Sequence, residues 1–214
     1  MTQMAVVCTD ELCALGIDSA AVYYNTDGSV EKIVNLDKII RLSPEVILAV
    51  AGSGYGIPLA VQLNNHLQKR GIWNYGDVVR RAIFFLREAI PRLQFSLKNS
   101  STHPDLERFY FLFMGRNQTK LLSKPLPEAH LVMSEELNGR LQIMPVPRVL
   151  TIPRQMGLEL RLIHLVNARA NSRAIVQTMH AYFRELSQSL DDVKPPFHFA
   201  IVSCNDFSLL RLSD

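Results

Sequence analysis

The sequence contains few cysteines. Only Cys8, Cys13 and Cys204 occur among 214 residues, and none belongs to a C-x-x-C pair. An odd number of cysteines inside apolar runs is typical of buried, inert thiols in a reducing compartment. In one extended segment, the five-residue separation of Cys8 and Cys13 places their side chains on opposite faces, which argues against a shared metal. We therefore expect free thiols and no metal site at these cysteines.

Long apolar runs are missing as well. No stretch approaches the roughly 20 apolar residues that span a bilayer. The N-terminus also has no basic segment followed by an apolar one, the pattern of a secretory signal. We therefore expect a soluble, cytoplasmic protein with no membrane partner.

The chain has no large excess of one charge. Its 23 Lys and Arg residues are interspersed with 20 Asp and Glu, which gives a net charge of +3. The dense basic patch of a nucleic-acid binder is absent, so we expect no nucleic-acid partner. The six histidines are scattered singly, without an H-E-x-x-H spacing, so we expect neither a metal nor a cofactor.

Hydrophobic residues make up 48% of the chain, enough for the core of one globular domain over residues 1–214. Their spacing predicts alternating groups of strands and helices. The expected strands are Met4–Cys8, Leu12–Ile17, Val22–Tyr24, Lys38–Leu42, Val46–Ala51, Phe109–Met114, His130–Met133, Leu141–Val146 and, as the last, Phe197–Cys204. The expected helices are Ile57–Leu67, Asp77–Ile90, Met156–Val166 and Ser172–Leu190.

This order of elements predicts an α+β fold with two stacked antiparallel sheets. Asn138–Gly139 is the strongest hairpin signal and joins two strands of the second sheet. A pair of helices on each outer face would bury every apolar stripe, which gives a four-layer α/β/β/α sandwich.

The N-terminus carries the clearest chemical signal. Thr2 follows Met1 directly, and its small side chain permits removal of Met1. One residue would then hold both a hydroxyl nucleophile and a free α-amine that can act as its base. Asp18 lies at the exit of the second expected strand, and Gly52 ends a buried strand before a glycine-rich turn.

These residues resemble a proteasome β-type subunit of the N-terminal nucleophile (Ntn) hydrolases. Asp18 follows Thr2 by sixteen positions, as the family's aspartate follows its nucleophile. The family's lysine falls at Lys38 in Asp37–Ile40, and its alanine–glycine strand end falls at Ala51–Gly52. The similarity is clearest from Thr2 to about Pro91 and implies a catalytic set of Thr2, Asp18, Lys38 and Gly52.

The chain also departs from the family pattern. Ala20 replaces an arginine, and about four extra residues precede Lys38, so Lys32 competes for the lysine role. Thr151–Arg154 stands where the family has a Gly-Ser-Gly loop. Asp192–Pro196 stands where the family has Asp-x-x-Ser-Gly. Those two loops normally supply groups that support the terminal amine, so their loss bears on activity.

The implied roles follow from the chemistry of each group. An α-amine has a pKa of roughly 7.7 to 8.0, and a nearby cation such as Lys38 lowers that pKa and frees the amine to accept a proton. A charge-assisted hydrogen bond to Asp18 would keep Lys38 protonated. The backbone N–H of Gly52 would stabilise the oxyanion.

The sequence fits three functions. The first is an N-terminal threonine hydrolase acting on peptide or amide bonds, whose acyl-enzyme chemistry would equally serve transpeptidation. The second is a catalytically impaired proteasome-like ring subunit with a structural or assembly role. The third is an unrelated α+β binding domain. The resemblance implies a peptide or protein substrate, a homo-oligomer such as a ring, and an ATPase unfoldase as partner.

Overall fold

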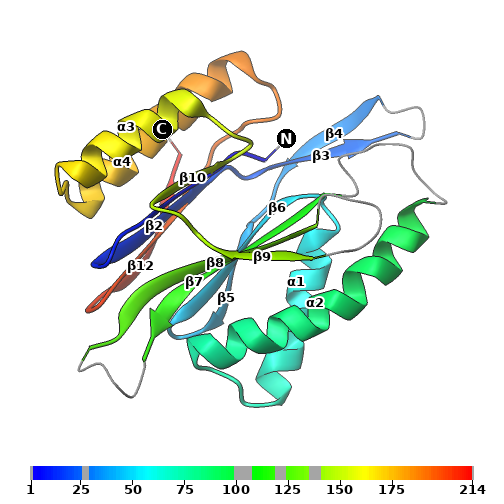
Figure 1. Cartoon of the computed structure of the whole chain (residues 1–214). Coiled ribbons are helices and arrows are strands. Elements are labelled where there is room, and N and C mark those ends of the chain that lie inside the picture. Colours follow the sequence, from blue (N-terminus) through cyan, green and yellow to red (C-terminus); the bar gives the residue numbers. More distant parts are fainter. Residues whose placement is uncertain (1, 26–28, 99–107, 119–123, 135–140, 214) are drawn as a thin grey trace.

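The computed structural model describes residues 2–25, 29–98, 108–118, 124–134 and 141–213, and Figure 1 shows the chain. The first five-stranded sheet has the order β10 (Val149–Ile152), β1 (Met4–Cys8), β2 (Leu12–Ile17), β11 (Phe197–Ser203) and β12 (Phe207–Leu212). The second runs β5 (Ile39–Ser43), β6 (Val46–Gly52), β7 (Phe109–Asn117), β8 (Leu126–Ser134) and β9 (Gln142–Pro145). A separate two-stranded sheet pairs β3 (Ala20–Tyr24) with β4 (Val30–Asn35). All neighbouring strands are antiparallel.

Four helices accompany these sheets in the described part of the chain, and each lies where the sequence predicts one. They are α1 (Gly56–Lys69), α2 (Tyr75–Lys98), α3 (Met156–Asn167) and α4 (Ser172–Ser189). Figure 1 shows α1 and α2 together on one side of the molecule and α3 and α4 together on the other.

Helices α1 and α2 pack on the second sheet. Leu59, Leu63 and Leu67 recur at helical spacing on α1 and are buried. They share one apolar cluster with Phe111 and Phe113 of β7. Burying each such side chain contributes about 1.5–3 kcal/mol, which fixes the helix on the sheet.

Helices α3 and α4 pack on the first sheet. Phe183 of α4 contacts the rings of Phe197 and Phe199 on β11. Gly16 of β2 lies beneath this cluster, and a Cβ added there would be 2.8 Å from the Phe199 ring. The absence of a side chain at Gly16 therefore permits the close approach of α4 to the sheet.

A third apolar cluster joins the two sheets. Alternate residues of β2 contribute to it, among them Leu15 and Ile17, and they pack with Ala49 of β6 and Leu112 of β7. The residues between them, such as Ala14, belong to the cluster under α3 and α4. Strands β1 and β2 are thus buried on both faces, which explains their nearly continuous apolar sequence.

Three strands differ from the sequence prediction. Strands β4 and β10 were not predicted, and β12 follows β11, so the prediction that the strand ending at Cys204 is the last one is wrong. Strand β10 has only four residues, and both β10 and β12 lie at the edges of the first sheet. Short or half-exposed edge strands carry little of the alternation by which strands are recognised. The Asn138–Gly139 turn lies outside the described residues.

The prediction of free thiols is wrong for Cys8 and Cys13, which form a disulfide. The two residues lie directly opposite each other in the β1–β2 hairpin. The alternation rule that placed them on opposite faces applies to a single extended segment, whereas here the chain reverses between them. Cys204 is a free thiol.

No helix within the described ranges is long and apolar enough to cross a membrane.

Candidate active site

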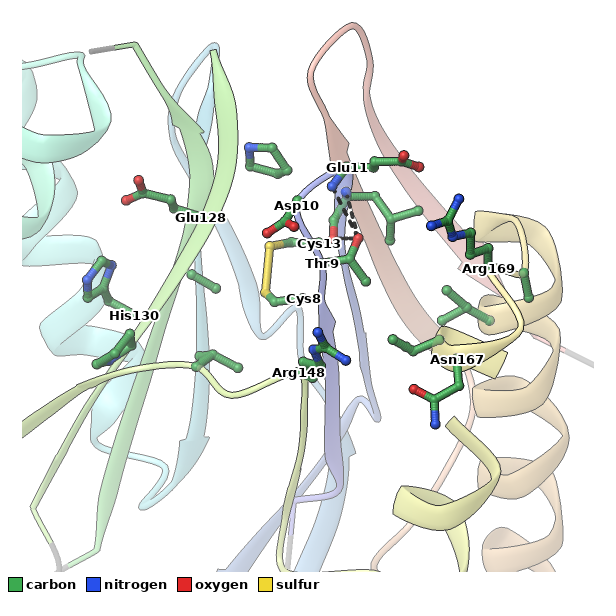
Figure 2. A pocket seen from close by; sticks show the side chains of 18 residues that line it. Cys8, Thr9, Asp10, Glu11, Cys13, Glu128, His130, Arg148, Asn167 and Arg169 are labelled. Atoms are coloured by element: carbon green, nitrogen blue, oxygen red, sulfur yellow. Dashed lines mark hydrogen bonds between the residues drawn. A yellow bond between two sulfur atoms is a disulfide. The ribbon is translucent and has the colours of Figure 1, made fainter. Parts of the chain in front are cut away.

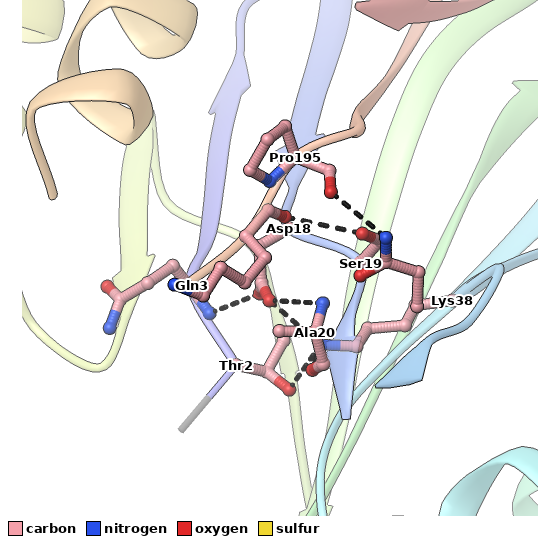
Figure 3. A network of polar contacts seen from close by, with 9 residues as sticks. Thr2, Gln3, Asp18, Ser19, Ala20, Lys38 and Pro195 are labelled. Carbon is pink, nitrogen blue, oxygen red and sulfur yellow. Dashed lines mark hydrogen bonds and ion pairs between the residues drawn. The ribbon is translucent and has the colours of Figure 1, made fainter. Parts of the chain in front are cut away.

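Thr2, Asp18 and Lys38 meet at one end of the two sheets (Figure 3). Thr2 precedes β1, Asp18 follows β2, and Lys38 directly precedes β5. The Nζ atom of Lys38 is 2.9 Å from Oγ1 of Thr2 and 3.1 Å from Oδ2 of Asp18. Their exposed fractions are 7% for Thr2, 0% for Asp18 and 2% for Lys38. The antiparallel β1–β2 hairpin brings the first two residues together, and β5 adds the third from the second sheet.

Asp18 organises the backbone around this contact. Its Oδ1 accepts the N–H of Gln3 at 2.7 Å, and its Oδ2 accepts the N–H of Ala20 at 2.9 Å. The N–H of Asp18 in turn donates to the carbonyl of Gln3 at 3.1 Å. The carboxylate therefore fixes the residue after Thr2 as well as Lys38. Lys38 donates a further hydrogen bond to the carbonyl of Ala20.

Burial shifts the pKa values of this pair in opposite directions. Loss of hydration raises the pKa of Asp18, although Lys38 and the backbone donors oppose that shift. Loss of hydration likewise lowers the pKa of Lys38, and the attraction of Asp18 opposes it. A lysine with a lowered pKa exchanges its proton more readily than a surface lysine.

Lys32, the competing lysine, does not join the site. It lies on the exposed strand β4, with Nζ 5.0 Å from the centre of the Tyr23 ring. The segment between Asp18 and Lys38 forms the β3–β4 hairpin. The extra residues are therefore accommodated in this hairpin, and Lys38 keeps its place beside Thr2.

Gly52 lines a small cavity together with Thr2 and Lys38. The cavity has a volume of about 200 Å³, and Thr2, Lys38 and Gly52 line it together with mostly apolar residues. The φ angle of Gly52 is +83°, and a Cβ there would collide with the carbonyl oxygen of Arg108. Only glycine fits this backbone without strain. Thr2, Lys38 and Gly52 thus line one cavity, and Asp18 contacts Lys38 from outside the cavity lining.

The second-half loops that depart from the family pattern also contact this region. Gln155, just before α3, donates from Nε2 to Oε1 of Gln3 at 3.2 Å and accepts the hydroxyl proton of Tyr182 at 2.8 Å. Thr151 supports this turn, because its Oγ1 accepts the N–H of Gln155 at 2.7 Å. No sequence pattern indicates this tether, since a glutamine before a helix has no distinctive spacing.

The proline-containing segment before β11 contributes only backbone groups. The carbonyl of Lys194 accepts a hydrogen bond from Oγ of Ser19 at 3.3 Å, and that of Pro195 accepts one from Nδ2 of Asn35 at 3.2 Å. Both donors lie in the segment between Asp18 and Lys38. The segment therefore supports the neighbours of the site rather than the site itself.

A larger hollow of about 830 Å³ lies at the other end of β1 and β2, and Figure 2 shows its lining. The Cys8–Cys13 disulfide forms part of its wall, with Glu128, Arg148 and Arg169 around it. None of the sequence-predicted site residues lines it.

Comparison with known proteins identifies a similar fold. The sequence matches no family model and no curated protein. A solved structure of the Gly-1 mutant of Anbu from Hyphomicrobium sp. strain MC1 matches with a TM-score of 0.68 and 16% sequence identity, over 100% of this chain and 87% of that chain. The chain has an Anbu-like fold.

Anbu is a proteasome-like protein of the Ntn-hydrolase class. The resemblance drawn from the N-terminal residues is therefore confirmed at the level of fold. The match spans the whole chain, whereas the sequence resemblance is clearest over its first half. At 16% sequence identity, the match shows a similar fold.

Proposed function

We propose that this protein is an N-terminal threonine hydrolase that cleaves peptide or amide bonds, and that its sheets and helices form the four-layer α/β/β/α sandwich of the Ntn hydrolases. The observation that carries the proposal is the contact of Lys38 with both Thr2 and Asp18, at 2.9 and 3.1 Å. The buried lysine is hydrogen-bonded to the threonine hydroxyl, and a buried carboxylate orients the lysine. This resembles the arrangement of a nucleophile with an oriented proton-transfer partner.

Removal of Met1 would complete the nucleophile by exposing the α-amine of Thr2. The Thr2 hydroxyl then loses its proton to this amine, with Lys38 as a relay, while Oγ1 attacks the substrate carbonyl carbon. The tetrahedral intermediate collapses, the C–N bond breaks, and the leaving amine takes up the proton. Water hydrolyses the resulting ester and restores the hydroxyl. Attack by a second amine instead of water would give transpeptidation.

Asp18 and Gly52 would complete the mechanism. Asp18 orients Lys38 and stabilises its ammonium form through a charge-assisted hydrogen bond. The backbone N–H of Gly52 is proposed to stabilise the oxyanion, an interaction that is worth a rate factor on the order of 10²–10³ in other enzymes. The apolar lining beside these residues favours a substrate with a small apolar side chain next to the cleaved bond.

Reaction with a peptide that carries a threonine-directed electrophile tests the proposal. The mature protein should gain one adduct, and peptide mapping should place it on Thr2. Thr2→Ser should keep labelling and amide hydrolysis, whereas Thr2→Ala should abolish both. Thr178→Ala, on α4 and remote from the cavity, is the matched control and should behave as wild type. An adduct elsewhere, or hydrolysis retained by Thr2→Ala, would refute the proposal.

The alternative is a catalytically impaired proteasome-like subunit with an assembly role. It is favoured by Pro153 and Pro195–Pro196, which replace the supporting serine-containing loops. An intact mass that includes Met1 would favour this alternative, because the α-amine is then part of a peptide bond. Native mass spectrometry would show in either case whether the protein forms the proposed homo-oligomer or ring. An ATPase unfoldase remains a proposed partner.

We also infer a cytoplasmic location. The redox state of Cys8 and Cys13 in the cell tests this location, because a reducing compartment would keep their disulfide open. Rapid alkylation of cells before lysis should find both cysteines reduced if the compartment is reducing. Recovery of the intact disulfide from quenched cells would argue for an oxidising location instead.

A further inference from the structure

His198 lies at the same end of the first sheet as the candidate active site. It is 7% exposed and pairs in register with Ile17, the residue before Asp18. Its neighbours Phe197 and Phe199 face α4, whereas Ala200 faces the second sheet. Because side chains alternate along a strand, His198 faces the layer between the two sheets, from which Lys38 approaches.

The imidazole of His198 reaches across to the residue before Lys38. Its Nε2 is 3.5 Å from Oδ1 of Asp37. This nitrogen is buried and has no hydrogen-bond partner among the residues that the structure describes. Asp37 itself is largely exposed on its side chain. The contact therefore connects β11 of the first sheet to the start of the segment that positions Lys38 in the second.

Four charged groups act on this imidazole. Burial lowers the pKa of His198, the cations Arg211 and Lys38 lower it further, and the anions Asp37 and Asp18 oppose the shift. Asp37 and Lys38 come from the segment before β5, Asp18 from the end of β2, and Arg211 from β12, opposite His198 in register. The imidazole is therefore neutral at neutral pH and gains its charge only under more acidic conditions than a free histidine.

We propose that His198 is a positioning residue for Lys38. The neutral imidazole leaves the lysine ammonium aligned on Thr2 and Asp18. Protonation of the imidazole disturbs that alignment. The imidazolium would attract Asp37 and repel the ammonium of Lys38. His198 would thus make the site sensitive to acid by a route separate from protonation of the Thr2 α-amine. The catalytic consequence rests on the proposed function, but the coupling of His198 to Lys38 does not.

Nuclear magnetic resonance of the full-length protein tests the coupling without any activity. Samples are labelled at the histidine rings and the lysine Nζ and Cε atoms, and His198→Gln assigns the His198 signals. We expect His198 to titrate below the ordinary histidine range, at a lower pH still in Asp37→Asn, and at a higher pH in Arg211→Gln. We also expect the Lys38 signal to change at the pH where His198 titrates, and to lose that change in His198→Gln.

His164→Gln, an exposed change on α3, is the matched control and should leave the Lys38 titration as in wild type. A Lys38 signal without an inflection at the His198 titration, or one that keeps it in His198→Gln, would overturn the proposal.

The rate of Thr2 labelling by the electrophile supplies the catalytic readout. His198→Gln cannot be protonated but keeps an amide where Nε2 lies, so it should retain the neutral-pH rate and show a shallower loss of rate on acidification. His198→Ala should lower the rate at every pH by about tenfold, through the rate constant more than through the affinity for the electrophile. An unchanged pH profile in His198→Gln would overturn the catalytic consequence. Absence of labelling in wild type would instead refute the proposed function, and the Lys38 titration would still decide the coupling.

Discussion

Lys38 is enclosed by three oxygen atoms, from the hydroxyl of Thr2, the carboxylate of Asp18 and the carbonyl of Ala20. Thr2 and Asp18 flank strands of the first sheet and Ala20 begins β3, whereas the lysine directly precedes β5 of the second sheet. A buried ion pair is not in itself strongly stabilising, because the loss of hydration offsets most of the attraction. Removal of one partner is different, because it leaves the other charge buried and unpaired.

Lys38→Ala should therefore destabilise the protein strongly. We expect a loss of about 3–5 kcal/mol in the free energy of unfolding, because Asp18 would stay buried without its cation. Denaturant unfolding followed by circular dichroism measures this change. Lys32→Ala, at the exposed competing lysine, should stay within about 0.5 kcal/mol of wild type. Equal effects at the two positions would contradict the assignment of Lys38 to the buried site.

The residues that gather at the candidate site were predicted from the sequence, whereas the contacts around them were not. Thr2, Asp18, Lys38 and Gly52 were identified because each has a residue type and a spacing that a family pattern preserves. Gln155 was missed because its tether to Gln3 depends on how α3 sits against β1, which no local pattern records. The same holds for His198, whose neighbours come from three different segments.

At the scale of elements, the approach of α4 to β2 depends on one missing side chain. Gly16→Ala would place a Cβ 2.8 Å from the Phe199 ring and 3.1 Å from that of Phe183. We expect a loss of about 1–3 kcal/mol, the usual effect of overpacking. Thermal or denaturant unfolding measures it. Gly157→Ala, on α3 with no atom within 4 Å of the added Cβ, should instead leave stability equal or raise it by up to about 1 kcal/mol.

The β1–β2 hairpin gives a second prediction at this scale. Reduction of the Cys8–Cys13 disulfide should lower the free energy of unfolding by about 2 kcal/mol, because the unfolded chain gains freedom in a short closed loop. Unfolding with and without a reducing agent measures the difference. Cys204→Ser should leave that difference unchanged, and Cys8→Ser should abolish it.

The prediction of helices and strands was most accurate where a long apolar pattern fitted only one type of element. The four helices and the buried strands β1, β2, β6 and β11 were recognised because their burial is periodic or continuous. The disulfide could have been predicted from the hairpin, since the two strands place Cys8 opposite Cys13 once the turn is accepted. Strand β4 could not have been predicted, because nearly all its residues are exposed and it pairs only with β3.

At the scale of the whole molecule, the burial of His198 predicts how stability depends on pH. The folded protein holds the pKa of His198 below its ordinary value of 6.5, mainly through burial. The unfolded chain therefore binds a proton on this residue first as the pH falls, so stability decreases from about pH 6.5 down to the lower folded-state pKa. His198→Gln should remove this part of the acid sensitivity, whereas His164→Gln should not. Urea unfolding at a series of pH values measures it, and parallel curves for wild type and His198→Gln would contradict the prediction.

Strand β1 is anchored at both of its ends. Gln3, just before the strand, exchanges hydrogen bonds with Asp18, and Cys8, its last residue, is bonded covalently to Cys13. Because strand side chains alternate, a shift of β1 by one residue would turn its whole inner face outward. The length of chain between these two anchors therefore sets how far Thr2 extends toward Lys38. An insertion or deletion within β1 would move the hydroxyl out of reach without altering a single residue of the site.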